Sequence, residues 1–255
     1  MVPVVLIGIS LIIVWKWPGL QALLTSTKEL KALLILLPML PYAVFAAAGL
    51  MGWRYTDMGL LAGAGILALS YFLSLRFSPG QWANTYYEAY LFLFPLNMTL
   101  CAGLIKRTIF SFSSMVIIPL IVLQIVLAGL FCGQVDFSTL TVISKLDGLF
   151  PFASIRLADI ADRVQSFLTL NSPVMPEFPL PAIFSFLFCL IYLSLRFLKN
   201  GDILLSGYIG GLTAVLLSAA ANRPDAATMV FHFAAGLTLV VVNIESSFFM
   251  AYMMN

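Results

Sequence analysis

Long runs without a charged side chain constrain this sequence more than any other feature. Residues 32–50, 115–132 and 203–221 contain no Asp, Glu, Lys or Arg. A helix needs about 20 such residues to cross the hydrocarbon core of a bilayer. The whole chain of 255 residues is 62% hydrophobic and 9% charged, whereas soluble domains average about 25% charged residues. A soluble enzyme, a disordered chain and a nucleic-acid-binding protein are therefore excluded, and the lipid bilayer is the expected partner.

We predict an all-α fold, a polytopic transmembrane helix bundle of seven or eight spans that forms a single domain over residues 1–255. The first apolar segment, 2–14, is short for a span; it either continues to Leu24 or lies in the membrane interface. Pro38 and Pro41 predict a kink in the second span. The expected spans are residues 2–14, 32–50, 59–75, 89–105, 115–132, 180–197, 203–221 and 229–255.

The connection over residues 133–179 is the one long stretch with regularly spaced charges. Within it, residues 154–170 carry apolar side chains at helical spacing, and charged residues occupy the other face. This pattern predicts an amphipathic helix on the membrane surface, between the fifth and sixth spans. Two interpretations stay open: a cover that packs onto the bundle, or a lid that senses a ligand.

Basic residues are equally numerous in the short loops on the two sides of the predicted bundle, so their count does not fix the orientation. Two groups, Lys106 with Arg107 and Arg196 with Lys199, lie within a few residues of span ends. This placement favours a cytoplasmic location for their side. The C-terminus would then be cytoplasmic, and the 133–179 connection would lie outside.

Polar side chains inside spans are costly and mark candidate functional sites. We expect Asn97, Gln124 and His232 to contribute to ligand binding. The alternative for Asn97 is to satisfy backbone groups freed by Pro95, and for His232 a hydrogen-bonded structural position. The sequence has no catalytic motif, and it predicts no cofactor. The three cysteines, 101, 132 and 189, fit no metal site and are expected to be buried free thiols.

The last apolar segment, 229–255, has no Gly or Pro after Gly236. Its span should leave the membrane near Glu245, yet the helical pattern continues beyond that residue. We therefore predict a continuous C-terminal helix that couples the bundle to something outside it, with Glu245 as a coupling residue. A pairing of Glu245 with Lys106, Arg107 or Arg196 is an alternative role. Two small-residue pairs, Gly59 with Gly63 and Gly207 with Gly211, predict close helix contacts.

Three segments resemble the multi-span membrane regions of bacterial GGDEF diguanylate cyclases. In that family an Ala-Tyr pair, here Ala251-Tyr252, precedes the run that opens the cyclase domain. The matching segments are residues 52–54, 94–100 with 104–107, and 234–237 through 245–246 to 250–252. No Gly-Gly-Asp/Glu-Glu-Phe site occurs in this sequence, so the family's metal-binding and GTP-binding residues have no positions here.

The resemblance implies a sensory or regulatory region that anchors and controls a C-terminal diguanylate cyclase in the bacterial inner membrane. Because such cyclases condense two GTP molecules between two catalytic domains, it also implies a homodimer. Coupling would run through Glu245, Ala251 and Tyr252, and the ligand would be a small apolar or amphipathic molecule in a cavity of the bundle. Two other classes remain open: a small solute carrier or channel, and a structural subunit of a membrane complex.

Overall fold

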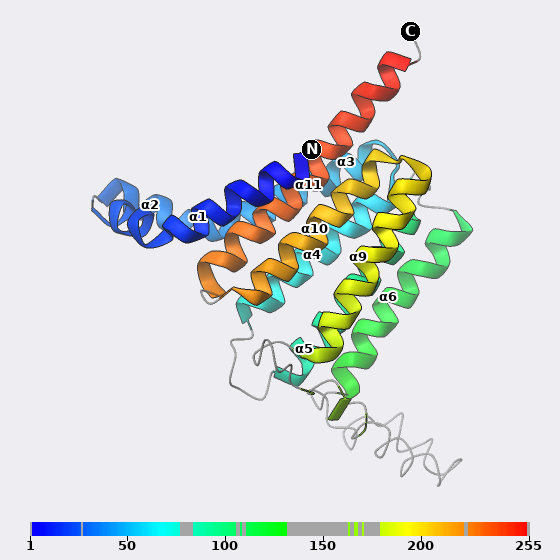
Figure 1. Ribbon diagram of the computed structural model, residues 1–255, viewed down its shortest axis with the longest axis horizontal. Helices are drawn as coiled ribbons and strands as arrows, with labels where there is room; N and C mark the ends of the chain where they lie inside the picture. Colours follow the sequence, from blue (N-terminus) through cyan, green and yellow to red (C-terminus); the bar gives the residue numbers. More distant parts are fainter. Residues whose placement is uncertain are drawn as a thin grey trace.

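The computed structural model describes residues 2–26, 28–76, 84–105, 108, 111–131, 163, 166–167, 170, 179–221 and 224–253. Its regular elements in this part of the chain are helices, as the sequence predicts (Figure 1). In chain order they are α1 (Val2–Leu24), α2 (Lys28–Leu36), the 3₁₀ turn η1 (Leu37–Met39), α3 (Leu40–Arg54), α4 (Met58–Arg76), α5 (Asn84–Gly103), α6 (Phe112–Phe131), α9 (Leu180–Asn200), α10 (Ile203–Ala220) and α11 (Pro224–Met253).

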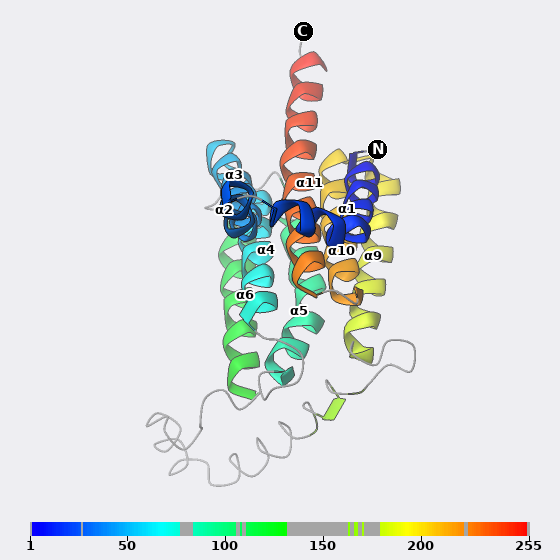
Figure 2. The same cartoon turned by 90° about the vertical axis from the view of Figure 1, so that its left-hand side faces the viewer.

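Helix α11 lies at the centre of the bundle and contacts α1, α3, α4 and α10. Helix α5 packs between α4 and α9, and α6 lies at the edge against α5. Figure 2 shows these helices side by side, with the C-terminal part of α11 projecting past the others. Helices α1 and α2 extend sideways from the bundle (Figure 1). The core therefore forms around the last described helix.

Two tight turns hold helix pairs together at the end of the bundle from which α11 projects. Between α3 and α4, Thr56 adopts a positive φ of 54° and the Asp57 carboxylate accepts a hydrogen bond from the Leu60 amide at 3.1 Å. Between α9 and α10, Gly201 has φ 63°, and Asp202 caps α10 by accepting from the Leu204 amide at 3.2 Å. A left-handed residue followed by an acidic cap ends one helix and starts the next.

Small residues set close helix contacts, among them three of the four predicted glycines, whereas a Cβ on Gly211 would meet only the Met98 side chain at 3.7 Å. A Cβ atom on Gly59 would lie 2.8 Å from the backbone nitrogen of Ile105, so α4 and α5 meet there backbone to backbone. A Cβ on Gly236 would lie 2.8 Å from the ring of Phe45, where α11 packs on α3. Gly63 faces Tyr208, and Gly207 packs against α11. Close packing through small residues is the main source of helix association in lipid.

The second predicted span is not one straight helix. Pro38 and Pro41 remove two backbone donors, and the structure has a 3₁₀ turn there that separates α2 from α3. The chain thus departs from a regular α-helix at the prolines where the kink was predicted. Helix α1 continues without interruption to Leu24, so the first helix has the length that a span requires.

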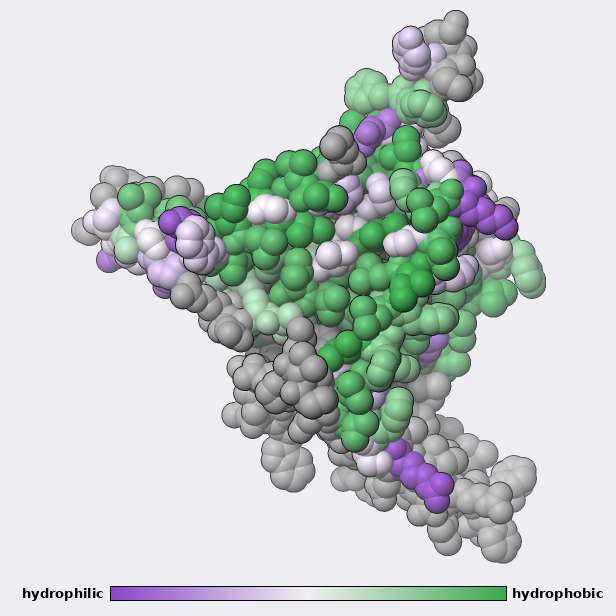
Figure 3. Space-filling view, viewed as in Figure 1, coloured by the Kyte–Doolittle hydropathy of each residue, from purple (hydrophilic) through white to green (hydrophobic). Residues whose placement is uncertain are grey.

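Six described helices are long and apolar enough to cross a membrane: Val2–Leu24, Leu34–Arg54, Met58–Leu75, Leu180–Asn200, Ile203–Ala220 and Ala226–Phe249. A shorter apolar helix covers Phe112–Ile125. Figure 3 shows hydrophobic side chains across the middle of one face, with hydrophilic ones at its margins. These features define an α-helical membrane protein. Most of the predicted amphipathic helix, residues 154–170, lies outside the described residues.

Candidate functional site

His232 lies on α11 with an exposed fraction of only 1%. Its Nδ1 is 2.8 Å from the Thr228 carbonyl oxygen on the same helix, and its Nε2 is 3.1 Å from the Ser70 hydroxyl on α4. Because a carbonyl oxygen can only accept, Nδ1 carries the hydrogen, and Nε2 of the neutral ring accepts from Ser70. The imidazole therefore ties the central helix to α4, which matches the hydrogen-bonded structural alternative for this residue.

Aromatic rings extend this contact between α4 and α11 toward the 3₁₀ turn. The Tyr71 ring packs 5.3 Å from the His232 ring and 5.0 Å from Tyr42 of α3, measured between centroids. The Tyr71 hydroxyl donates to the Pro38 carbonyl oxygen at 2.9 Å. Pro38 lies in η1, where the proline-containing turn departs from regular α-helix. One continuous chain of contacts thus joins η1, α3, α4 and α11.

Asn97 is fully buried on α5, and neither its Nδ2 nor its Oδ1 has a hydrogen-bond partner among the described residues. The alternative that its amide satisfies the backbone around Pro95 is therefore wrong. The Thr99 hydroxyl bonds to the Pro95 carbonyl at 2.8 Å instead. Asn97 shares a helical face with Tyr90, whose hydroxyl donates to the Ile66 carbonyl of α4 at 3.1 Å.

A second buried polar group lies where α4 and α10 meet. The Tyr208 hydroxyl of α10 has no hydrogen-bond partner within the described part of the chain. A Cβ on Gly63 of α4 would lie 3.0 Å from that hydroxyl oxygen. An unpaired buried hydroxyl or amide costs free energy. The polar side-chain atoms of Tyr208 and Asn97 are thus unpaired in the described structure. Tyr208 could not be singled out from the sequence, because tyrosine is also a common packing residue.

Gln124 lies on α6 at the edge of the bundle, partly buried, and its Oε1 is unpaired among the described residues. Helix α6 contacts α5, whereas His232 belongs to the α4–α11 contact. In the described residues, no hydrogen bond connects any two of Asn97, Gln124 and His232. The described structure therefore shows no hydrogen-bonded cluster of the three predicted ligand-binding residues, and their role in ligand binding stays a prediction.

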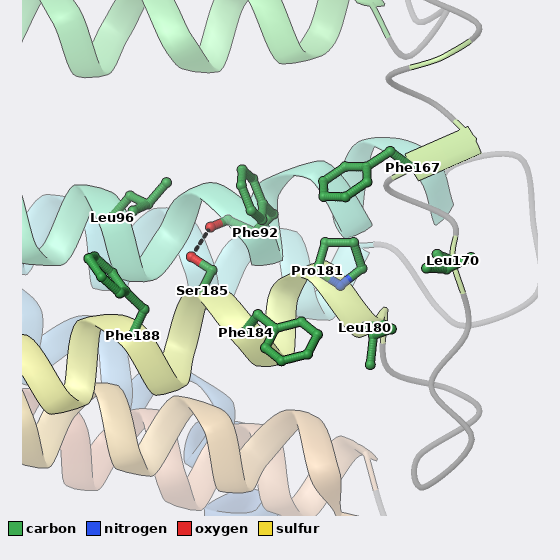
Figure 4. A pocket seen from close by; sticks show the side chains of 9 residues that line it. All are labelled: Phe92, Leu96, Phe167, Leu170, Leu180, Pro181, Phe184, Ser185 and Phe188. Atoms are coloured by element: carbon green, nitrogen blue, oxygen red, sulfur yellow. Dashed lines mark hydrogen bonds between the residues drawn. The ribbon is translucent and has the colours of Figure 1, made fainter.

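A pocket of about 490 Å³ lies between α5 and α9 (Figure 4). The one polar side chain among its described lining residues, Ser185, donates to the Phe92 carbonyl oxygen at 2.8 Å. Phe167 and Leu170, from the segment predicted to form a cover or lid, complete the wall. The lining residues are Phe92, Leu96, Phe167, Leu170, Leu180, Pro181, Phe184, Ser185 and Phe188. Sequence patterns could not single out these residues, because each resembles any other lipid-facing side chain.

The predicted coupling residues all lie on the outer part of α11. Glu245 is exposed, as are Ala251 and Tyr252, and Tyr252 has an exposed fraction of 83%. Arg196, one proposed partner of Glu245, donates to the Ala102 carbonyl at 3.3 Å. Lys106 and Arg107 lie outside the described residues.

Cys101 and Cys189 are buried free thiols, as predicted, and Cys132 lies outside the described residues. Within the described residues, no group of three or more His, Cys, Asp or Glu side chains could hold a metal ion. The fold and these sites define the class: an α-helical membrane protein with a buried hydrogen bond between α4 and α11 and an apolar pocket between α5 and α9. No protein-family profile, curated protein or solved structure matches the chain.

Proposed function

We propose that this chain is a membrane-embedded sensory or regulatory input domain whose final helix controls a cytoplasmic output domain. The observation that carries the proposal is the continuity of α11. This helix has 30 residues and a length of about 45 Å, whereas the hydrocarbon core is about 30 Å thick. Its buried part ends near Ser246, and Phe248 is 73% exposed. A single rigid element thus leads from the core of the bundle to its outside.

The position of α11 inside the bundle supports a signalling role. Three described helices besides its neighbour α10 pack on it, and the His232–Ser70 hydrogen bond fixes its position against α4. Any ligand that favours one packing arrangement of these helices over another would shift α11. The same displacement would then appear at Ala251 and Tyr252, because no Gly or Pro interrupts the helix after Gly236.

The resemblance to GGDEF proteins makes a diguanylate cyclase the expected output domain, and a homodimer the expected assembly. In this proposal α5 and α6 cross the bacterial inner membrane together with the six helices already identified, which gives eight spans. The turns that contain Asp57 and Asp202 lie at the end from which α11 projects (Figure 2). Arg54 and Lys199 are exposed near these turns. Because basic residues are enriched on the cytoplasmic side of membrane proteins, the proposal assigns this end to the cytoplasm.

A solute carrier is the weaker candidate on the same evidence. Carriers commonly have broken helices at corresponding positions in their two halves. The N-terminal half has the 3₁₀ turn at Leu37–Met39, whereas α9, α10 and α11 are unbroken. The described helices therefore give no matched pair of interruptions.

The test uses the complete reading frame that contains this chain, expressed in bacterial membranes with cyclic di-GMP as the readout. Two glycines inserted after Ser247 would break the helix between the bundle and the output domain, and should abolish regulated synthesis. The matched control inserts seven helix-forming residues at the same place. Seven residues make nearly two turns and shift the phase of the helix by only about 20°, so regulation should be retained.

Regulation that survives the two glycines would overturn the coupling role of α11. A reading frame without an output domain would overturn the proposed function itself. Equal loss in both insertion variants would also count against a signal that depends on helical phase. Membrane localisation and protein abundance, measured by immunoblotting, must match the wild type for each variant.

A further inference from the structure

We propose that the pocket between α5 and α9 binds the hydrocarbon chain of a free fatty acid. This assignment deepens the proposed function, since it names the ligand class of the input domain. The binding itself does not require an output domain. Failure of the signalling proposal and failure of this one are therefore distinguishable.

The chemistry of the lining selects a hydrocarbon chain. Eight of the nine lining residues are apolar, and the ninth, Ser185, already donates its hydroxyl hydrogen to the Phe92 carbonyl. The described wall thus offers no charged group and no free hydroxyl hydrogen to a polar ligand. Phe92 and Phe167 meet edge to face at 6.3 Å between ring centroids, which closes one end of the pocket with aromatic surface.

The position of the pocket gives the ligand a route of entry. Phe184 and Phe188 lie on the outer face of α9, with exposed fractions of 63% and 67%. Helix α9 is one of the membrane-span candidates, so this face contacts lipid. A hydrophobic molecule dissolved in the bilayer can reach the pocket without crossing water.

The volume favours one chain. A methylene group is about as large as a water molecule, which occupies roughly 30 Å³. A pocket of about 490 Å³ therefore holds on the order of sixteen such groups. This corresponds to the length of a single long-chain fatty acid.

One basic residue is available for the carboxylate of such a chain. Arg163 has helical backbone and an exposed side chain, and it precedes the pocket residue Phe167 by four positions. The Ser166 hydroxyl donates to the Arg163 carbonyl at 2.9 Å, as in a helical turn. Residues four apart share one helical face. The proposal therefore assigns the carboxylate to Arg163, the described basic residue four positions before Phe167.

Ligand binding in the pocket would change the packing of the helices around it. The Leu180 amide, at the start of α9, donates to the Leu170 carbonyl at 2.8 Å, so the closing segment is tied to α9. Helix α9 packs on α10, and α10 packs on the central α11. A hydrocarbon chain bound between α5 and α9 would therefore displace α9, and the displacement would pass through α10 to α11.

The experiment is photocrosslinking of the purified full chain in nanodiscs with a palmitate analogue that carries a diazirine near its methyl end. Mass spectrometry locates the labelled residues, and unlabelled palmitate competes. Label should concentrate on residues 92–96 and 180–188. Leu96→Trp fills the pocket and should reduce competed labelling by about tenfold or more, because excluded methylene groups lose their burial.

A second variant, Phe188→Ala, truncates an exposed wall residue without disturbing the core, so it keeps the test valid if Leu96→Trp does not fold. It should weaken labelling by several-fold. Leu195→Ala is the matched control, since Leu195 is 61% exposed on the same helix and lies outside the pocket. Labelling spread evenly along the lipid-facing side of α9 and unaffected by Leu96→Trp would overturn the proposal.

The second part of the experiment distinguishes a free fatty acid from a phospholipid as the source of the bound hydrocarbon chain. Arg163→Gln should weaken palmitate binding by several-fold and leave hexadecanol binding unchanged, because only palmitate carries a carboxylate. Competition by palmitate but not by dioleoyl phosphatidylglycerol supports the free fatty acid. Competition by the phospholipid at equal or lower concentration would overturn that choice and assign the pocket to a membrane lipid.

Discussion

Helices α1 and α11 contain similarly apolar stretches but have opposite surroundings. Most of the apolar stretch of α11 is buried inside the bundle, whereas almost all of that of α1 is not. Helix α1 presents large aliphatic side chains such as Val4 and Ile12 to its surroundings. Helix α11 has Ala227, Ala235 and Gly236 at its contacts. Hydropathy thus shows that both helices suit a membrane, whereas small residues show which one other helices can approach.

The largest expected difference between the two helices concerns leucine. Leu239 of α11 is 2% exposed and Leu11 of α1 is 49% exposed. Leu239→Ala leaves a cavity and should lower the free energy of unfolding by about 2–5 kcal/mol. Leu11→Ala exchanges one lipid contact for another and should change it by less than about 0.5 kcal/mol. Unfolding by SDS in mixed micelles measures both values; equal losses would refute the contrast.

Replacing a glycine with alanine should change the free energy of unfolding differently in the two helices. A Cβ on Gly236 meets the Phe45 ring at 2.8 Å, so Gly236→Ala should cost about 1–3 kcal/mol by overpacking. A Cβ on Gly8 meets nothing within 4 Å. Gly8→Ala should therefore leave stability unchanged or raise it by up to about 1 kcal/mol, because alanine favours the helix. The same titration tests the pair, and destabilisation by Gly8→Ala would place α1 in tighter contact than described.

Polar side chains should give the smallest contrast. His232 links two helices, whereas the Ser10 hydroxyl donates to Leu6 of its own helix at 2.8 Å. His232→Leu should cost about 0.6–1.7 kcal/mol, the range for hydrogen bonds between membrane helices. Ser10→Ala should change stability by less than about 0.5 kcal/mol. Thermal unfolding in detergent, followed by circular dichroism, compares them; a larger loss for Ser10→Ala would contradict the assignment.

The helices themselves were predictable from the sequence because apolar runs and their breaks are local properties. The predicted span 59–75 became α4, Met58–Arg76, and Pro38 with Pro41 marked the 3₁₀ turn. The continuation of the last helix beyond Glu245 was also predictable, since no Gly or Pro interrupts it. Each of these inferences needs only residues that are neighbours in the chain.

The candidate sites were less predictable because they depend on which faces meet. One alternative for Asn97 was to serve the backbone near Pro95, yet its amide is unpaired in the described structure and Thr99 bonds there instead. The α5–α9 pocket combines Phe92 with Phe167 and Phe184, which lie more than 70 residues further along the chain. Apolar side chains in a membrane protein have no local pattern that separates a pocket wall from a lipid-facing surface.

The contact between Gly236 and Phe45 also bears on biosynthesis. About 190 residues separate the two positions, and chains grow at roughly 5–20 residues per second. Helix α3 therefore enters the bilayer on the order of 10 to 40 s before α11 exists to cover it. During that interval Tyr71 of α4 can already contact the Phe45 ring, but the side that Gly236 covers has no protein against it. The contact between α3 and α11 thus forms only after all the helices between them have been synthesised.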